Sequence, residues 1–262
     1  MSGPVALHGG AEFLPGDEPV LDALLGLAVA HVAADRPIRI AIVPTAAARG
    51  RPDLAAANGV AAFERVAARR GLAVDAAAVL VVDAVSAADQ DLAARLADAD
   101  IVHFPGGDPD LIPGILPGSV AEAALRRAHE AGAVLAGASA GAMALATWCW
   151  TPTGGAPGLG FVAGLIVVPH ADPPRWTDAL ARFGGWAPAG LGAIGLGEQT
   201  AVISRDVDGT AGGPDAAGGP DAARVIRWRV VGPGEVRWRP SPDAETLVAR
   251  DGATIETGAP SA

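Results

Sequence analysis

The sequence predicts an α/β fold built on a mainly parallel β-sheet with an antiparallel edge near the C-terminus. Short apolar runs alternate with alanine-rich amphipathic segments from residue 5 onward, which is the rhythm of βαβ units. After about residue 198 the pattern changes to short strand-like pieces with no helical segment between them, as is typical of antiparallel strands. The chain has 262 residues, 50% of them hydrophobic, which is enough to bury a large core. We therefore expect one domain over residues 1–262.

The alternation assigns each element in order. Strands are expected at Val5–His8, Ile38–Val43, Val79–Val82, Ile101–Phe104 and Val134–Ala136. Helices are expected at Val20–Ala33, Leu54–Arg70, Ala87–Leu96 and Val120–Glu130. The C-terminal strands are expected at Thr200–Ser204, Val225–Val231 and Glu235–Trp238. Residues 209–221 carry a doubled Gly-Gly-Pro-Asp, which predicts a flexible low-complexity loop.

Charge and cysteine content exclude several classes of function. The formal net charge is −10 and the chain contains arginine but no lysine, which argues against a nucleic-acid partner. The single cysteine, Cys149, cannot form an intramolecular disulfide or a thiolate metal site, and its apolar surroundings suggest a buried position within the helix after the serine turn. Histidines and carboxylates do not recur at ligand spacing, so we expect no metal and no cofactor. The oligomeric state stays open, with a homodimer among the alternatives.

The apolar segment from Ala131 to Trp150 is about long enough to span a bilayer. Its interior Gly137-Ala138-Ser139-Ala140-Gly141 favours a buried strand, a tight turn and a buried helix instead, so no membrane partner is expected. The N-terminus shows no basic segment followed by a long apolar one, as an export signal would. A cytoplasmic location is expected.

Ser139 lies in a Gly-x-Ser-x-Gly pattern, Gly137 to Gly141, which follows a predicted strand. In such a strand–turn–helix elbow the serine Oγ is lifted toward substrate, and the backbone N–H of the next residue points at a developing oxyanion. Flanking glycines are needed because the turn leaves no room for Cβ atoms. The pattern makes Ser139 a candidate nucleophile and Ala140 a candidate oxyanion donor.

Other site residues should follow neighbouring strands, because ligands of open α/β sheets bind at the carboxyl ends of the strands. Gly106-Gly107 follows a predicted strand, and its N–H groups can approach a ligand closely, although a plain tight turn explains the pair equally well. A serine also needs a base, usually histidine. His8 and His170 both sit at strand ends, and His170 is preferred because a polar loop follows it.

Several of these segments, in this order, resemble the serine peptidases that include cyanophycinase and dipeptidase E. The resemblance rests on Phe104–Asp108, the elbow from Gly137 to Ala142, the strand-end His170 followed by an arginine, and Gly195–Ala201. The openings Leu7–Glu12 and Ile40–Ala46 also look like that family, so the match spans residues 5 to 204. It implies a three-layer αβα fold like that of class I glutamine amidotransferases, with serine in place of cysteine.

Carried over to this chain, the resemblance implies Ser139 as nucleophile, His170 as general base, and Gly107 with Ala140 as oxyanion donors. It implies a small peptide or amide substrate cleaved beside an aspartyl residue. Asp108 and Arg175 are the expected substrate contacts, and Arg182 is a further candidate, because a guanidinium matches a carboxylate. For Arg182 a structural salt bridge is an equal alternative.

The third member of the triad departs from the family pattern. Such enzymes take an Asp or Glu from the stretch after the elbow helix, yet Met143 to His170 contains no acidic residue. Asp172 and Glu198 are the possible substitutes. Asp172 is only two residues from His170, whereas Glu198 begins a predicted strand, so Glu198 is preferred.

These observations leave two main functions. The first is a serine peptidase or amidase that hydrolyses aspartyl-type peptide or isopeptide bonds through an acyl-enzyme at Ser139. The alternative is a noncatalytic member of the family that binds or senses a small ligand. An α/β-hydrolase esterase is disfavoured because no histidine follows His170. A glutaminase is disfavoured because the elbow carries serine.

Overall fold

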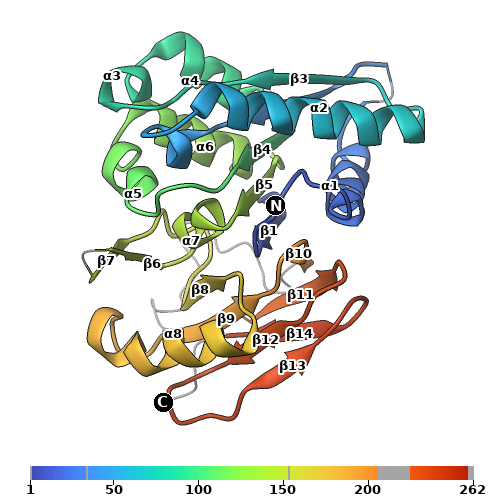
Figure 1. The fold of residues 1–262 in the computed structure, drawn as a ribbon. Helices are drawn as coiled ribbons and strands as arrows, with labels where there is room; N and C mark the ends of the chain where they lie inside the picture. Colours follow the sequence, from blue (N-terminus) through green and yellow to red (C-terminus); the bar gives the residue numbers. More distant parts are fainter. Residues whose placement is uncertain (1, 34, 153, 206–224, 259–262) are drawn as a thin grey trace, which may run out of the picture.

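A computed structural model of the protein describes residues 2–33, 35–152, 154–205 and 225–258. The described residues form an α/β architecture with two β-sheets (Figure 1). The loop expected at 209–221 lies outside the described residues. Among the described residues, no helix is both long and apolar enough to cross a membrane.

The larger sheet has eight strands, five of them parallel. In spatial order they are β14 (Thr254–Thr257), β11 (Ile226–Val231), β10 (Ala201–Arg205), β1 (Val5–His8), β5 (Val134–Ala138), β4 (Ile101–Phe104), β2 (Ile38–Ile42) and β3 (Val74–Ala78). Strand β1 pairs with β5 in parallel and with β10 antiparallel, and β11 and β14 continue the antiparallel side. The predicted fold class, a mainly parallel sheet with an antiparallel C-terminal edge, is confirmed.

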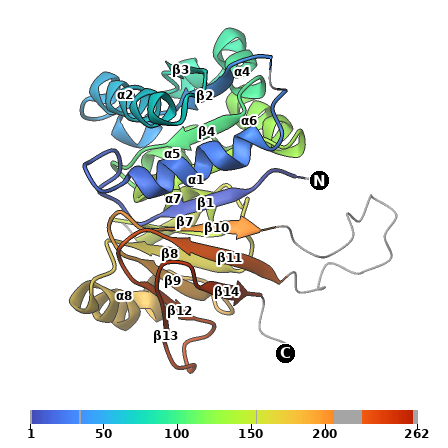
Figure 2. The ribbon, with the colours of Figure 1, turned by 90° about the vertical axis from the view of Figure 1, so that its right-hand side faces the viewer.

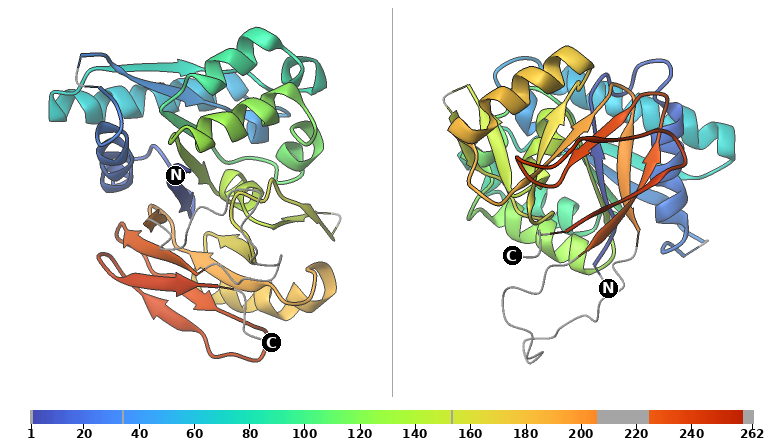
Figure 3. Two further views of the ribbon diagram at one scale, coloured as in Figure 1. Left: turned by 180° about the vertical axis from the view of Figure 1, so that it is seen from behind. Right: turned by 90° about the horizontal axis from the view of Figure 1, so that it is seen from below.

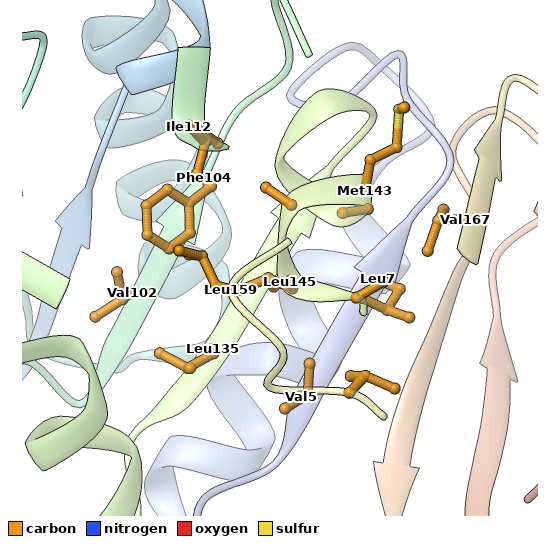
Figure 4. Close-up of a cluster of buried hydrophobic side chains, with 14 of the residues drawn as sticks. Val5, Leu7, Val102, Phe104, Ile112, Leu135, Met143, Leu145, Leu159 and Val167 are labelled. Atoms are coloured by element: carbon orange, nitrogen blue, oxygen red, sulfur yellow. The ribbon is translucent and has the colours of Figure 1, made fainter. Parts of the chain in front are cut away.

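Helices cover both faces of the parallel strands, and the alternation of side chains explains why. Helices α1 (Glu18–Val29) and α2 (Pro52–Arg70) pack on Ile38, Ile40 and Ile42. The other face carries Val102, Phe104 and Leu135 against α4 (Gln90–Ala97), α5 (Leu111–Ile115) and α6 (Val120–Glu130), and part of this cluster is drawn in Figure 4. Figure 2, turned from the view of Figure 1, shows α1 lying along β1. Successive strand residues point to opposite faces, so both helical layers are held by one set of strands.

A second sheet, of six strands, was not expected. Its order is β13 (Leu247–Ala249), β12 (Val236–Arg239), β9 (Gly192–Leu196), β8 (Leu165–Pro169), β6 (Trp148–Thr151) and β7 (Gly154–Pro157). Helix α8 (Pro173–Trp186) packs Trp176 and Phe183 against Ile166 and Val168 of β8. The view from below in Figure 3 shows α8 on the outside of this sheet. The chain therefore has a further helix layer beyond the predicted three.

The third strand was misassigned. The strand is β3, Val74–Ala78, which pairs with β2 in parallel, and the predicted Val79–Val82 follows it without regular structure. Val79 and Val81 are fully buried in the core beneath the helices, so their apolar character reflects burial and not strand pairing. The alanine-rich β3 looks helical by composition, which concealed it.

Two further expectations were wrong in detail. The helix expected at Ala87–Leu96 is two helices, α3 (Ala84–Ala87) and α4, because the Asp89 carboxylate accepts the N–H groups of Asp91 and Leu92 and starts a new helix. Cys149 is not in the helix after Ser139, because α7 (Ala140–Leu145) ends after six residues and Cys149 lies in strand β6.

His103 makes the stability of the native state depend on pH. It lies on β4, is 3% exposed, and burial lowers the pKa of its imidazole to about 3, with the nearby His8 adding to the effect. The unfolded chain binds this proton near pH 6.5 but the native chain does not, so stability is lost as pH falls below 6.5.

We expect the free energy of unfolding of the wild type to fall by about 2 kcal/mol more than that of His103→Leu between pH 7 and pH 5. Urea titrations of both proteins at these two pH values measure the difference. Equal decreases in the two proteins would show that His103 does not take up a proton on unfolding.

Candidate active site

Ser139 occupies the turn between the end of β5 and the start of α7. Its backbone has φ 50° and ψ −112°, a region that a side chain adopts at a cost of about 1–3 kcal/mol. The Ser139 N–H donates to the His8 carbonyl at 2.9 Å, which holds the turn. A Cβ added at Gly137 would collide with the backbone of Gly141, and one at Gly141 would collide with the Phe104 carbonyl. The flanking glycines are therefore required by close backbone approach, as the sequence suggested.

His170 directly follows β8 and faces this serine. Its Nε2 lies 3.1 Å from Ser139 Oγ. Like Ser139 it has a positive φ, 51°, and its N–H donates to the Gly9 carbonyl at 2.8 Å. The larger and the smaller sheet thus each supply one partner of the hydrogen bond.

Glu198 follows β9, the strand next to β8, and its Oε1 lies 2.9 Å from His170 Nδ1. The alternative, Asp172, does not face the imidazole in this way. Its carboxylate accepts the Arg175 N–H at 2.8 Å and caps the start of α8. The structure therefore brings Glu198 to His170 and leaves Asp172 as a helix cap.

The serine hydroxyl, the imidazole and the carboxylate form one chain of hydrogen bonds, and the carboxylate decides which imidazole nitrogen carries the proton. A carboxylate at Nδ1 favours the tautomer with the proton on that nitrogen, which leaves the Nε2 lone pair for the serine O–H. Such an arrangement can remove the hydroxyl proton during attack on a carbonyl and can stabilise the resulting imidazolium.

The serine opens into a cleft of about 760 Å³ between the two sheets. Its lining includes Ser139, His170, Gly197 and Gly107, which has φ 153°. The remaining lining residues come from the start of α8 and from the second sheet: Ala171, Asp172, Pro173, Arg175, Glu198, Glu235 and Arg237. Predicted residues Gly107 and Arg175 are thus at the cleft.

Three other predicted residues are not among the residues that line the cleft. Ala140 begins α7, and N–H groups in a first helical turn lack intrahelical partners, so its N–H is available near the serine. Asp108 is not among the residues that line the cleft. Its carboxylate lies 3.5 Å from the Arg49 guanidinium, and its N–H donates to the Ala46 carbonyl at 2.7 Å. Arg182 is exposed on α8, away from the lining residues.

Arg237 and Glu235 belong to the cleft wall and were missed in the sequence. Arg237 is 8% exposed and donates to the Ala171 carbonyl at 2.8 Å and to Glu235 Oε2 at 2.6 Å. Arg250 also contacts Glu235. Alternation along Arg237-Trp238-Arg239 indicated a strand but could not show that Arg237 faces inward, since which face is buried depends on β9 and α8.

The other histidines have different surroundings. His8, the second candidate base, is 3% exposed and its Nε2 bonds Asp17 Oδ1 at 2.8 Å. His103 is buried in the core, as expected for a strand residue. His129 of α6 packs edge-on against Phe161, and His31 is exposed just beyond α1.

Cys149 is buried and is not a candidate nucleophile. Burial raises the pKa of the Cys149 thiol to about 12, so no thiolate forms near neutral pH. No group of three or more His, Cys, Asp or Glu side chains lies together as a metal site would require, in residues 2–33, 35–152, 154–205 and 225–258.

The sequence profile of peptidase family S51 matches residues 18–210, well over half of the chain. The chain belongs to peptidase family S51. This confirms the predicted resemblance to the serine peptidases of the dipeptidase E and cyanophycinase group. A search of curated protein sequences finds no match.

Solved structures agree with the S51 assignment at the level of the fold. A peptidase from an acI-B1 Actinobacterium is 23% identical, with a TM-score of 0.70 and 97% of each chain covered. A putative peptidase E from Listeria monocytogenes EGD-e is 14% identical, with a TM-score of 0.52, covering 78% of this chain and 94% of the other. Both are peptidases by description, and their likeness supports the S51 fold of this chain.

Proposed function

We propose that this S51 chain hydrolyses peptide or isopeptide bonds beside aspartyl residues, through an acyl-enzyme at Ser139. The observation that carries the proposal is the chain of hydrogen bonds from Ser139 Oγ to His170 Nε2, at 3.1 Å, and from His170 Nδ1 to Glu198, at 2.9 Å. Glu198 supplies the carboxylate that the stretch before His170 lacks, so the noncatalytic alternative loses its main support.

The reaction runs in two steps. Ser139 Oγ attacks the scissile carbonyl as His170 takes its proton, and Gly107 and Ala140 N–H groups stabilise the oxyanion. The C–N bond then breaks, the amine leaves with the proton from His170, and an ester to Ser139 remains. Water, deprotonated by His170, attacks this ester and releases the free acid and the serine.

A preference for an acidic residue rests on one guanidinium at the cleft, that of Arg175, since the lining also carries the carboxylates of Asp172, Glu198 and Glu235. Arg237 is already bound to Glu235 and to the Ala171 carbonyl. Arg175 is exposed at the cleft, and only its backbone N–H is engaged by Asp172 among the contacts found in the described residues. A guanidinium in this position can donate two parallel hydrogen bonds to a substrate carboxylate.

Replacing Arg175 by alanine is expected to raise KM for an aspartyl substrate about 10- to 100-fold with little change in kcat, because charged hydrogen bonds contribute about 1.5–3 kcal/mol. Steady-state kinetics on matched Asp and Asn substrates measure the effect, and the Asn substrate should be affected much less. Arg182→Ala, on the same helix, is the matched control. Equal losses with both substrates would contradict a role in carboxylate recognition.

The function itself is tested by incubating the purified protein with α-aspartyl dipeptides, β-aspartyl-arginine and cyanophycin and measuring released amino acids. Turnover of one class identifies the bond type. Tight binding of a member of this panel without release of product, even on long incubation, would contradict the peptidase proposal and favour the ligand-binding alternative.

A further inference from the structure

Three residues around the candidate site have a positive φ, and the backbone N–H of each is bound by the same short segment of chain. Ser139, His170 and Gln199, which follows Glu198, have φ values of 50°, 51° and 52°. Their N–H groups donate to three consecutive carbonyls, those of His8, Gly9 and Gly10, at 2.9, 2.8 and 2.8 Å. One short segment after β1 therefore holds the backbone of all three strand ends that carry the serine, the imidazole and the carboxylate.

The same segment also reaches the glycine pair. Glu12 Oε1 accepts the Gly106 N–H at 2.7 Å. A Cβ added at Gly106 would lie 3.1 Å from Ser139 Cβ and 3.2 Å from Glu12 Oε1, so the serine and the Glu12 carboxylate flank the same glycine. Gly106 precedes Gly107, whose N–H is the proposed second oxyanion donor.

Buried contacts fix the two ends of this segment, which we call the His8–Asp17 loop. His8 and Asp17 are 3% and 1% exposed, and their side chains bond at 2.8 Å. The second Asp17 oxygen accepts the Phe13 N–H at 2.9 Å, and His8 Nδ1 accepts the Gly10 N–H at 3.1 Å. Phe13 in turn packs on His103, with ring centroids 4.9 Å apart. These contacts fix the conformation of the loop independently of its hydrogen bonds to the site.

We propose that the His8–Asp17 loop is the positioning element of the active site, with Glu12 as the residue that fixes the oxyanion donor Gly107 through Gly106. The inference rests on the proposed function. Glu12 is not among the cleft-lining residues, so it acts through the glycine pair and not on substrate. A carboxylate acceptor suits this task because hydrogen bonds to an ionised group are shorter and stronger than neutral ones.

The test compares three variants. Glu12→Ala removes the acceptor, whereas Glu12→Gln keeps an amide oxygen that can still accept the Gly106 N–H. Glu122→Ala is the matched control, because Glu122 Oε2 also accepts a glycine N–H, that of Gly118, at 2.7 Å, but lies on α6. We measure kcat and KM for the best substrate, the melting temperature, and the rate at which a fluorophosphonate modifies Ser139, followed by mass spectrometry.

We expect Glu12→Ala to lower kcat and the modification rate about 10- to 100-fold, with KM within about two-fold of wild type, since a misplaced oxyanion donor affects the transition state and not substrate binding. Glu12→Gln should retain most of both rates. Glu122→Ala should lower the melting temperature without lowering kcat, which separates positioning from stability.

Two results would overturn the inference alone: an active wild type whose kcat is unchanged in Glu12→Ala, or a loss of kcat in Glu122→Ala equal to that in Glu12→Ala. A wild type that neither cleaves a substrate nor reacts with the fluorophosphonate would instead overturn the proposed function, and the positioning role with it. The two failures are therefore distinguishable.

Discussion

Replacing Ser139 by alanine is expected to lower kcat by about 10⁴-fold or more, because the variant keeps the cleft and the oxyanion donors but lacks the atom that forms the ester. Alanine retains the Cβ at this position, so the strained turn changes little. The release of amino acids from the best substrate, followed over hours at high protein concentration, measures the residual rate.

Ser204→Ala is the matched control for this substitution. Ser204 Oγ accepts the Val5 N–H at 2.8 Å, on the pair of strands β10 and β1. We expect its loss to cost about 1 kcal/mol of stability and to leave kcat unchanged. Full activity in Ser139→Ala would place the nucleophile elsewhere.

The second large effect is expected at Glu198. Glutamine at this position can present its NH₂ to His170 Nδ1, which favours the tautomer with the proton on Nε2 and removes the base from Ser139. In serine proteases the corresponding change lowers kcat by about 10⁴-fold. The Glu198 side chain is 62% exposed, so we expect a smaller decrease, about 10²- to 10³-fold.

Asp172→Asn separates the two acidic candidates. Asparagine is also a good N-cap, so α8 should persist, and kcat should stay within about three-fold of wild type. The pair is compared by kcat at pH 7 and pH 9. If Asp172→Asn lost activity and Glu198→Gln did not, Asp172 would be the acid that serves His170.

The local sequence pattern was enough to predict the candidate site residues that lie at the ends of strands. Ser139 and His170 each directly follow an apolar strand, so each could be placed at the carboxyl end of a strand without knowing which strands pair. That the two strands belong to different sheets could not be inferred. Glu198 was preferred to Asp172 for a different reason, as the start of a predicted strand, whereas the structure places it two residues after the end of β9. The structure brings these three side chains into hydrogen-bond range.

Other features depended on long-range contacts. The second sheet forms because β12 pairs with β9 and β6 with β8, and no local pattern specifies such partners. Helix α8 did leave a local signal, Asp172 followed by two prolines at the start of an amphipathic segment, which is a helix start that we did not use. The role of the His8–Asp17 loop could not be inferred, because its hydrogen bonds join residues as far apart along the chain as Gly9 and Thr200.

Detection of the acyl-enzyme would show directly whether Ser139 is the nucleophile. The protein is mixed with its best substrate, quenched in acid during turnover, digested and analysed by mass spectrometry. We expect a mass increase equal to the acyl part of the substrate on the peptide that contains Ser139. This adduct should disappear once the substrate is exhausted and should be absent in Ser139→Ala. Turnover that continues in Ser139→Ala, or an adduct on a different residue, would contradict this role of Ser139.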